Sequence, residues 1–181
     1  MNKSVVERVT RETKIHLEVA HGEGKSEVQT GVQFLDHMMV TFARYSGLDV
    51  TLRATGDLRH HTIEDVAIAM GTAIAELLPA SAARYGDRTI PMDEALVQAC
   101  IDLGGRAFYR GPLPSSLYDH WMRSFADNAK ATVHLRVLRG TDRHHIVEAA
   151  FKALGLAVRD AMRDGGGAVF STKGPVALEV K

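Results

Sequence analysis

The feature that most constrains the fold of this chain is an internal repeat. Residues 34–75 align with residues 117–159, and both segments carry an Asp-His pair followed by a His-His-x-x-Glu motif. The single histidine and the histidine pair are separated by nearly the same distance in the two copies. An ordered series of matches of this kind indicates a duplicated structural unit. We therefore predict two similar half-domains, residues 1–88 and residues 89–181, that form one compact unit.

Each copy of the repeat predicts the same run of elements. A helix with apolar residues at helical spacing comes first, at residues 34–45 and 117–129. A strand of alternating character follows, at residues 48–54 and 131–138. A second helix is expected to begin at or just after each histidine pair. The repeated unit is therefore helix, strand, helix.

Extended segments precede each copy. We predict one hairpin over residues 5–19 and another over residues 94–109, the second turning at Gly104-Gly105. The fold class is thus α+β and internally duplicated, each half being a β-sheet covered on one face by two helices. The helices of the two halves would pack against each other or against a neighbouring subunit. Asp93-Glu94 is interpreted as a structural pair that closes the link between the halves.

The His-His-x-x-Glu motifs predict metal binding. On a helix, His60 and His61 both lie within reach of Glu64. Adjacent histidines differ by about 100° in direction, so they rarely bind one ion together. Each pair is therefore expected to serve two different ions, with His37 and His120 supplying further ligands. Four protein ligands on an octahedral ion would leave positions open for substrate.

A single histidine pair would more simply be a helix start or a polar surface patch. Two copies at matched positions, each with a matched upstream histidine, favour metal sites. The chain has one cysteine, Cys100, which excludes a cluster of thiolates. Imidazole and carboxylate ligands suit manganese, iron, nickel or zinc. His16, His21 and His134 lack the repeated context and are interpreted as ordinary strand or loop histidines.

Composition excludes several classes of function. The 181 residues include 22 basic and 22 acidic side chains, a balance that argues against a nucleic-acid-binding protein. No apolar run is long enough to cross a bilayer, and residues 1–8 lack the apolar core of a signal peptide. We therefore expect a cytoplasmic protein with no membrane partner.

Several segments, in order, resemble the imidazoleglycerol-phosphate dehydratase family over nearly the whole chain. They are residues 30–38, 56–57, 60–65, 91–96, 144–149, 151–153 and 171–174. The resemblance implies a Mn2+-dependent hydro-lyase of histidine biosynthesis that converts imidazole glycerol phosphate to imidazole acetol phosphate. It also implies two Mn2+ per chain and a large homo-oligomer, a 24-mer in that family, with active sites built between subunits.

The resemblance also implies site residues. The metal ligands would be His37, His60, His61, Glu64, His120, His144, His145 and Glu148. The phosphate group of the small phosphorylated imidazole substrate would bind Arg84, Arg106, Ser171 and Lys173. The catalytic carboxylates would be Glu12, Glu64 and Glu148, with Glu12 placed to take part in proton transfer.

The chain departs from the family pattern at a few places. The turn before His60 and the link before His120 are short, and Thr41 and Tyr45 stand where the family has glutamine and histidine near the substrate. Two alternatives therefore stay open: a two-metal enzyme that acts on another phosphorylated small molecule, and a non-catalytic metal-binding assembly protein. Arg84 and Arg106 argue against the second, because an assembly protein needs no phosphate site.

Overall fold

The structure is a computed structural model that describes residues 3–167. The two halves run through the same order of elements. The first half comprises β1 (Lys3–Val9), β2 (Thr13–His21), β3 (Ser26–Gln29), α1 (Gln33–Ser46), β4 (Leu48–Gly56) and α2 (Arg59–Leu77). The second comprises β5 (Tyr85–Met92), β6 (Ala95–Asp102), β7 (Phe108–Arg110), α3 (Ser116–Asn128), β8 (Thr132–Arg139) and α4 (Arg143–Ala161).

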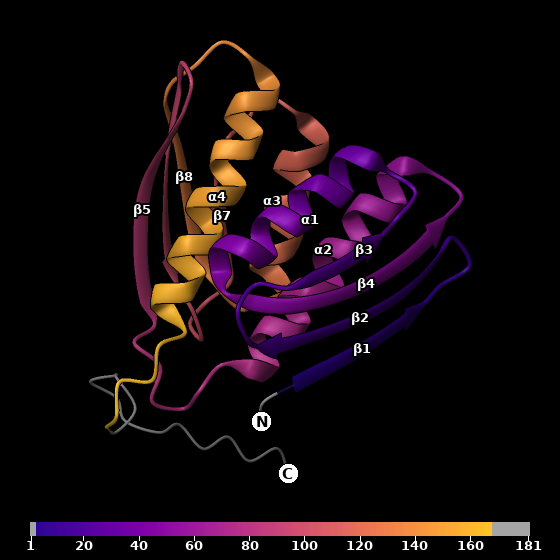
Figure 1. Cartoon of the computed structure of the whole chain (residues 1–181), viewed down its shortest axis with the longest axis horizontal. Helices are drawn as coiled ribbons and strands as arrows, with labels where there is room; N and C mark the ends of the chain where they lie inside the picture. The colour runs from indigo at the N-terminus through magenta and orange to yellow at the C-terminus, as the bar shows by residue number, and fades with distance from the viewer. Residues whose placement is uncertain (1–2, 168–181) are drawn as a thin grey trace.

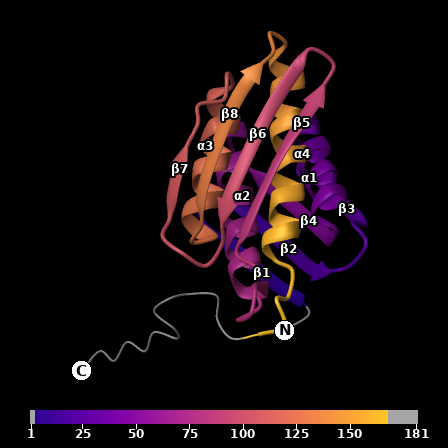
Figure 2. The same ribbon diagram turned by 90° about the vertical axis from the view of Figure 1, so that its left-hand side faces the viewer.

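The two sheets have identical topology. Their strand orders are β1-β2-β4-β3 and β5-β6-β8-β7, antiparallel except for the last pair, in which β3 runs parallel to β4 and β7 parallel to β8. In each half the helices cover one face of the sheet, and the four helices lie between the two sheets (Figure 1, Figure 2). The predicted duplicated α+β fold is confirmed.

The helices of the two halves pack against each other, which answers the question that the sequence left open. Helix α1 packs on α4 of the other half, and α2 packs on α3. Fully buried aromatic side chains fill the space where the helices meet: the Trp121 ring stacks on Phe125 at 5.3 Å between centroids, and Phe42 and Phe151 pack beside them. Burial of such side chains is the main force that joins the halves.

The prediction for the second hairpin was wrong. Strand β6 pairs with β5, so the hairpin turns at Asp93-Glu94, and the turn at Gly104-Gly105 instead leads into β7, which pairs with β8. Strand β5 is an edge strand with alternating exposed and half-buried residues, and it therefore lacks a strong apolar pattern. Asp93-Glu94 consequently closes a hairpin within the second half and does not link the halves.

The boundary predicted between residues 88 and 89 falls inside β5 and stays a prediction. The hairpin expected over residues 5–19 corresponds to β1 and β2. Each second helix begins one residue before its histidine pair, as the sequence indicated. None of the helices in residues 3–167 combines the length and apolar character that a membrane crossing needs.

Candidate metal centres

Residues from both halves meet at each of two clusters of metal-binding side chains. The first, which we name the α1–α4 cluster, consists of His37, His144 and Glu148. Oε2 of Glu148 lies 3.1 Å from Nε2 of His37 and 3.2 Å from Nε2 of His144. One ligand atom from each residue lies within 4.8 Å of the others. An ion between them would draw on α1 of one half and α4 of the other.

The second group, which we name the α2–α3 cluster, consists of His60, Glu64 and His120. Nε2 of His120 lies 3.2 Å from Oε1 of Glu64, and Nε2 of His60 lies 3.5 Å from Oε2. The rings of His60 and His120 are 5.1 Å apart between centroids. The duplication thus places a glutamate and a histidine of one motif beside the upstream histidine of the other half, twice.

The aspartate before each upstream histidine fastens the segment that leads into its helix. Oδ1 of Asp36 accepts hydrogen bonds from the backbone N–H and the hydroxyl of Thr30, at 2.8 and 2.6 Å. Oδ1 of Asp119 accepts from the N–H of Leu113 and the hydroxyl of Tyr109, at 2.8 and 2.6 Å. In each Asp-His pair, the aspartate therefore holds the start of the helix in place and the histidine belongs to a cluster.

The donor sets suit a divalent transition metal. Two imidazole nitrogens and one carboxylate form each cluster, a combination that binds Mn2+, Fe2+ or Zn2+. Nε2 of His120 is buried and makes no hydrogen bond among residues 3–167, because its 3.2 Å contact with Glu64 lacks hydrogen-bond geometry, although a buried polar atom normally has a partner. A metal ion would satisfy this nitrogen, so the residues fit such an ion.

His61 and His145 belong to neither cluster of the described residues. The two rings of each pair are nearly perpendicular, with interplanar angles of 78° for His60 and His61 and 89° for His144 and His145. His61 and His145 therefore direct their nitrogens away from the ion that their neighbours would bind. This divergence is what the sequence predicted from helix geometry.

Carboxylates hold both of these divergent rings at Nδ1. Nδ1 of His61 lies 2.8 Å from Oδ1 of Asp57 and 3.6 Å from Oε2 of Glu12. Nδ1 of His145 lies 2.7 Å from Oε2 of Glu94. These hydrogen bonds raise the pKa of His61 and of His145. The bond from His145, together with those from the backbone N–H groups of Asp142 and Thr141, lowers the pKa of Glu94 to about 2.

The two cluster glutamates differ in their surroundings. Glu148 is buried, which opposes its ionisation, but hydrogen bonds from Lys152 and His37 prevail and lower its pKa. Nζ of Lys152 lies 2.9 Å from Oε1 of Glu148. Glu64 is about one-third exposed. The duplicated clusters therefore share a ligand set but differ in local charge.

The predicted phosphate-binding residues lie elsewhere. Arg84 makes a bidentate ion pair with Asp102 of β6, and its backbone N–H donates to the carbonyl of Ala161, at the end of α4. Arg106 is exposed in the loop between β6 and β7, beside Gly105, which packs near Arg84. Ser171 and Lys173 lie outside the described residues.

Three side chains at these centres had not been predicted from the sequence to take part in the metal sites. Asp57, Glu94 and Lys152 all belong to segments that carry the family resemblance. Lys152 stands four residues after Glu148, a spacing that places the two on one helix face and so could have indicated the contact. Asp57 and Glu94 contact their histidines from a turn and a hairpin, which sequence spacing does not reveal.

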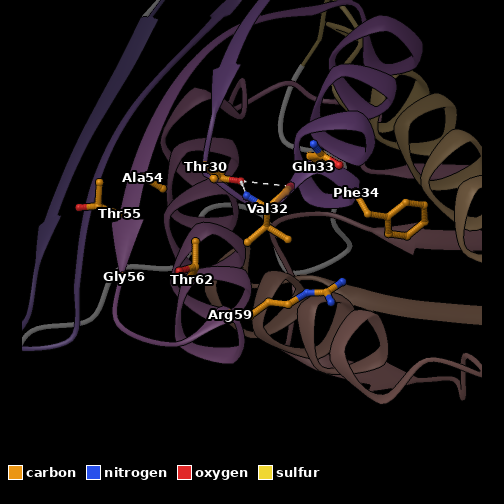
Figure 3. Close-up of a pocket in the computed structure, with 10 residues that line it drawn as sticks. Thr30, Val32, Gln33, Phe34, Ala54, Thr55, Gly56, Arg59 and Thr62 are labelled. Carbon is orange, nitrogen blue, oxygen red and sulfur yellow. Dashed lines mark hydrogen bonds between the residues drawn. The ribbon is translucent and has the colours of Figure 1, made fainter.

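A cavity of about 760 Å3 is lined in part by Phe34, a neighbour of the α1–α4 cluster. The segment from Thr30 to Phe34, the end of β4 and the start of α2 surround it, and Figure 3 shows the Arg59 side chain at its edge. The ring of Phe34 lies 5.0 Å from that of His144. An open volume beside the cluster leaves room for a bound molecule.

The sequence profile of the imidazoleglycerol-phosphate dehydratases matches residues 30–158. The chain belongs to this family. The enzyme of Chlorobium chlorochromatii is 43% identical in an alignment of 187 positions that covers 94% of this chain and 95% of that one. The enzyme of Salinispora tropica is 44% identical in an alignment of 179 positions that covers 86% of this chain and 88% of that one.

Solved structures of the family have the same fold. The imidazoleglycerol-phosphate dehydratase of Pyrococcus furiosus superimposes with a TM-score of 0.87 at 39% identity, over 94% of this chain and all of that one. The Staphylococcus aureus enzyme gives 0.81 at 30% identity, over 90% of this chain and 99% of that one. Imidazoleglycerol-phosphate dehydratases are metal-dependent hydro-lyases of histidine biosynthesis, and that is the activity of this chain. The alternatives left open by the sequence are thereby set aside.

Proposed function

We propose that this imidazoleglycerol-phosphate dehydratase forms imidazole acetol phosphate at manganese centres that two or more subunits complete. The single observation that carries this proposal is the divergence of the histidine pairs. His60 and His144 join clusters within the chain, whereas His61 and His145 direct their rings away from them. Each chain would thus hold one ion with the α1–α4 cluster and one with the α2–α3 cluster, and would lend His61 and His145 to neighbours.

The position of Arg84 supports a site shared between subunits. Arg84 hydrogen-bonds the last residue of α4, whereas His144 and His145 lie at its first turn. A helix of 19 residues separates the two ends by roughly 27 Å. A substrate the size of a phosphorylated imidazole cannot span that distance. If Arg84 and Arg106 bind its phosphate, His144 and His145 of the same chain cannot hold its imidazole ring, and a neighbouring chain in a large homo-oligomer such as a 24-mer would supply them.

The chemistry follows from the residues. Mn2+ held by the cluster residues would act as a Lewis acid and favour loss of the N–H proton from the imidazole ring of the substrate. In the overall reaction, the carbon attached to the ring loses its hydroxyl group and the next carbon loses a proton, which together leave as water. The enol that results becomes the ketone of imidazole acetol phosphate. Glu12 has an exposed carboxylate 3.6 Å from Nδ1 of His61, and we assign it the transfer of a proton. Arginine guanidinium groups would hold the phosphate.

The activity is tested with purified protein, Mn2+ and imidazole glycerol phosphate, with the product followed by its absorbance. We expect turnover in the wild type and loss of turnover in His61→Ala. A fully metal-loaded, assembled protein without turnover would contradict the proposal.

A mixing experiment tests whether sites are shared. Glu148→Ala and His145→Ala proteins should each be inactive, and their mixed assemblies should regain turnover, because some sites then pair an intact Glu148 with an intact His145. The control is the double variant mixed with either single variant, which should regain nothing. Absence of recovery in properly mixed assemblies would mean that each chain builds its centres alone.

A further inference from the structure

The two halves hold their divergent histidines, His61 and His145, through carboxylates from different parts of the chain. Each half has a glutamate immediately before the second strand of its hairpin, Glu12 before β2 and Glu94 before β6. The duplication makes these two glutamates counterparts. Nevertheless, Oε2 of Glu94 is 2.7 Å from Nδ1 of His145, whereas Glu12 stands 3.6 Å from Nδ1 of His61.

The turn that precedes each histidine pair explains the difference. In the first half, Oδ1 of Asp57 accepts the hydrogen bond of the His61 ring, at 2.8 Å from Nδ1. In the second half, the aspartate of the turn is occupied otherwise, because Oδ1 of Asp142 caps α4 by accepting from the backbone N–H groups of His144 and His145. The His145 ring therefore takes its carboxylate from the hairpin.

Glu94 is held on both oxygens. Its Oε1 accepts hydrogen bonds from the backbone N–H groups of Thr141 and Asp142, at 3.1 and 2.8 Å, while Oε2 meets His145. Because the carboxylate is held in position, its hydrogen bond also sets the orientation of the His145 imidazole ring. With Nδ1 engaged as a hydrogen-bond donor, the neutral ring carries on Nε2 the lone pair that a metal ion needs. The exposed carboxylate of Asp93 lies 3.6 Å from this Nε2, beyond hydrogen-bond distance.

We propose that Glu94 is a positioning residue that holds His145 in the orientation and tautomer for metal binding, and that its counterpart Glu12 is left free for the substrate. This inference rests on the proposed role of His145 as a ligand. It assigns the two hairpin glutamates, which the duplication made alike, to separate tasks. An outer-shell carboxylate of this type typically changes metal affinity by about 10–100-fold when it is removed.

The test is Mn2+ binding to the whole, assembled, metal-free protein, with free Mn2+ followed by its electron paramagnetic resonance signal. We expect Glu94→Ala to weaken part of the Mn2+ sites by about 10–100-fold. Glu94→Gln should weaken them as well, because one amide oxygen cannot accept from the ring and from both backbone N–H groups. Glu94→Gln also keeps the size of the side chain and so guards against a variant that fails to fold.

Two further variants separate the outcomes. Asp142→Ala removes the helix cap but leaves the bond between Glu94 and His145, so it should lower the unfolding temperature and leave Mn2+ affinity nearly unchanged. His145→Ala should weaken Mn2+ binding at least as much as Glu94→Ala. If His145→Ala weakens binding and neither Glu94 variant does, the role of Glu94 is refuted and the proposed function stands. If His145→Ala itself has no effect, His145 is not a ligand and both fail.

Turnover gives the final distinction. Excess Mn2+ should restore most of the turnover of Glu94→Ala, because the loss is one of metal affinity. It should not restore that of Glu12→Gln, in which the fault lies in the chemistry. Persistent inactivity of Glu94→Ala at saturating Mn2+ occupancy would overturn the proposal, since it would place Glu94 on the substrate.

Discussion

The α1–α4 and α2–α3 clusters have the same kinds of ligand at matched positions of the repeat, yet their contacts and surroundings differ. One oxygen of Glu148 lies near both of its histidines, whereas each oxygen of Glu64 lies near a different one. Four residues after the cluster glutamate, the second half has Lys152 and the first has Ile68. Nζ of Lys152 contacts Glu148 at 2.9 Å and lies above the ring of Tyr45. The side chain of Glu148 is 9% exposed and that of Glu64 is 34% exposed. The two copies of the repeat therefore share their ligand types but differ in the charge and burial around them.

The neighbouring apolar residues differ in the same direction. Phe34, at the start of α1, lies 5.0 Å from the ring of His144 and 6.4 Å from that of His37. Its counterpart in the repeat is Leu117. The α1–α4 cluster therefore has an aromatic wall, a buried glutamate and an added positive charge. Equal ligand sets consequently do not imply equal metal affinity.

The largest effect should come from removing either cluster glutamate. Glu64→Ala and Glu148→Ala should each lower kcat/KM by about a thousandfold, because metal catalysis supplies several kcal/mol and 1.36 kcal/mol is tenfold in rate. Steady-state kinetics with the metal content of each variant measures this. Asp127→Asn, an exposed carboxylate on α3, is the control and should have wild-type kinetics. An active Glu64→Ala protein would show that only one cluster takes part in the reaction.

A second prediction concerns the contacts between the helices of the two halves. Gly71 and Gly155 occupy matched repeat positions, and each faces the partner helix. A Cβ at Gly71 would lie 2.6 Å from the carbonyl of Phe125 and 2.8 Å from the N–H of Ala129. One at Gly155 would lie 3.0–3.2 Å from its nearest neighbours. The α2–α3 crossing is therefore the tighter of the two.

We expect Gly71→Ala to lower the free energy of unfolding by about 1–3 kcal/mol, the usual cost of overpacking. Gly155→Ala should cost less, because the neighbours need to shift by only a few tenths of an ångström. Both variants gain the same helix propensity, so the difference between them reports packing alone. Thermal unfolding of both proteins is the measurement, and equal destabilisation would refute the ranking of the two crossings.

How far the sequence predicted the molecule depended on how local each signal was. The repeat predicted the two halves, and helix geometry predicted that His60 and His61 would diverge, because both follow from spacing along one element. The pairing of His37 with Glu148 across the halves was not predicted, since no periodicity encodes which helices cross. The contacts of Glu94 were missed for the same reason, because they join a hairpin to a distant turn. Strands β3 and β5 were missed because both are edge strands whose residues are exposed or half-buried and so give no strong apolar pattern.

The smallest predicted effect tests the difference in charge between the two clusters by removing the lysine from one and adding a lysine to the other. Lys152→Met should strengthen Mn2+ binding at the α1–α4 cluster by about tenfold, because a positive charge that repels the ion and competes for Glu148 is removed. Ile68→Lys should weaken the α2–α3 cluster correspondingly, since a half-buried lysine at this position can extend its ammonium group toward Glu64. Chelator competition on the metal-free protein measures both affinities, with Glu148→Ala and Glu64→Ala assigning each constant to its cluster. If Lys152→Met instead weakens binding, the lysine serves to orient Glu148, and the two clusters differ in how their glutamates are held and not in charge.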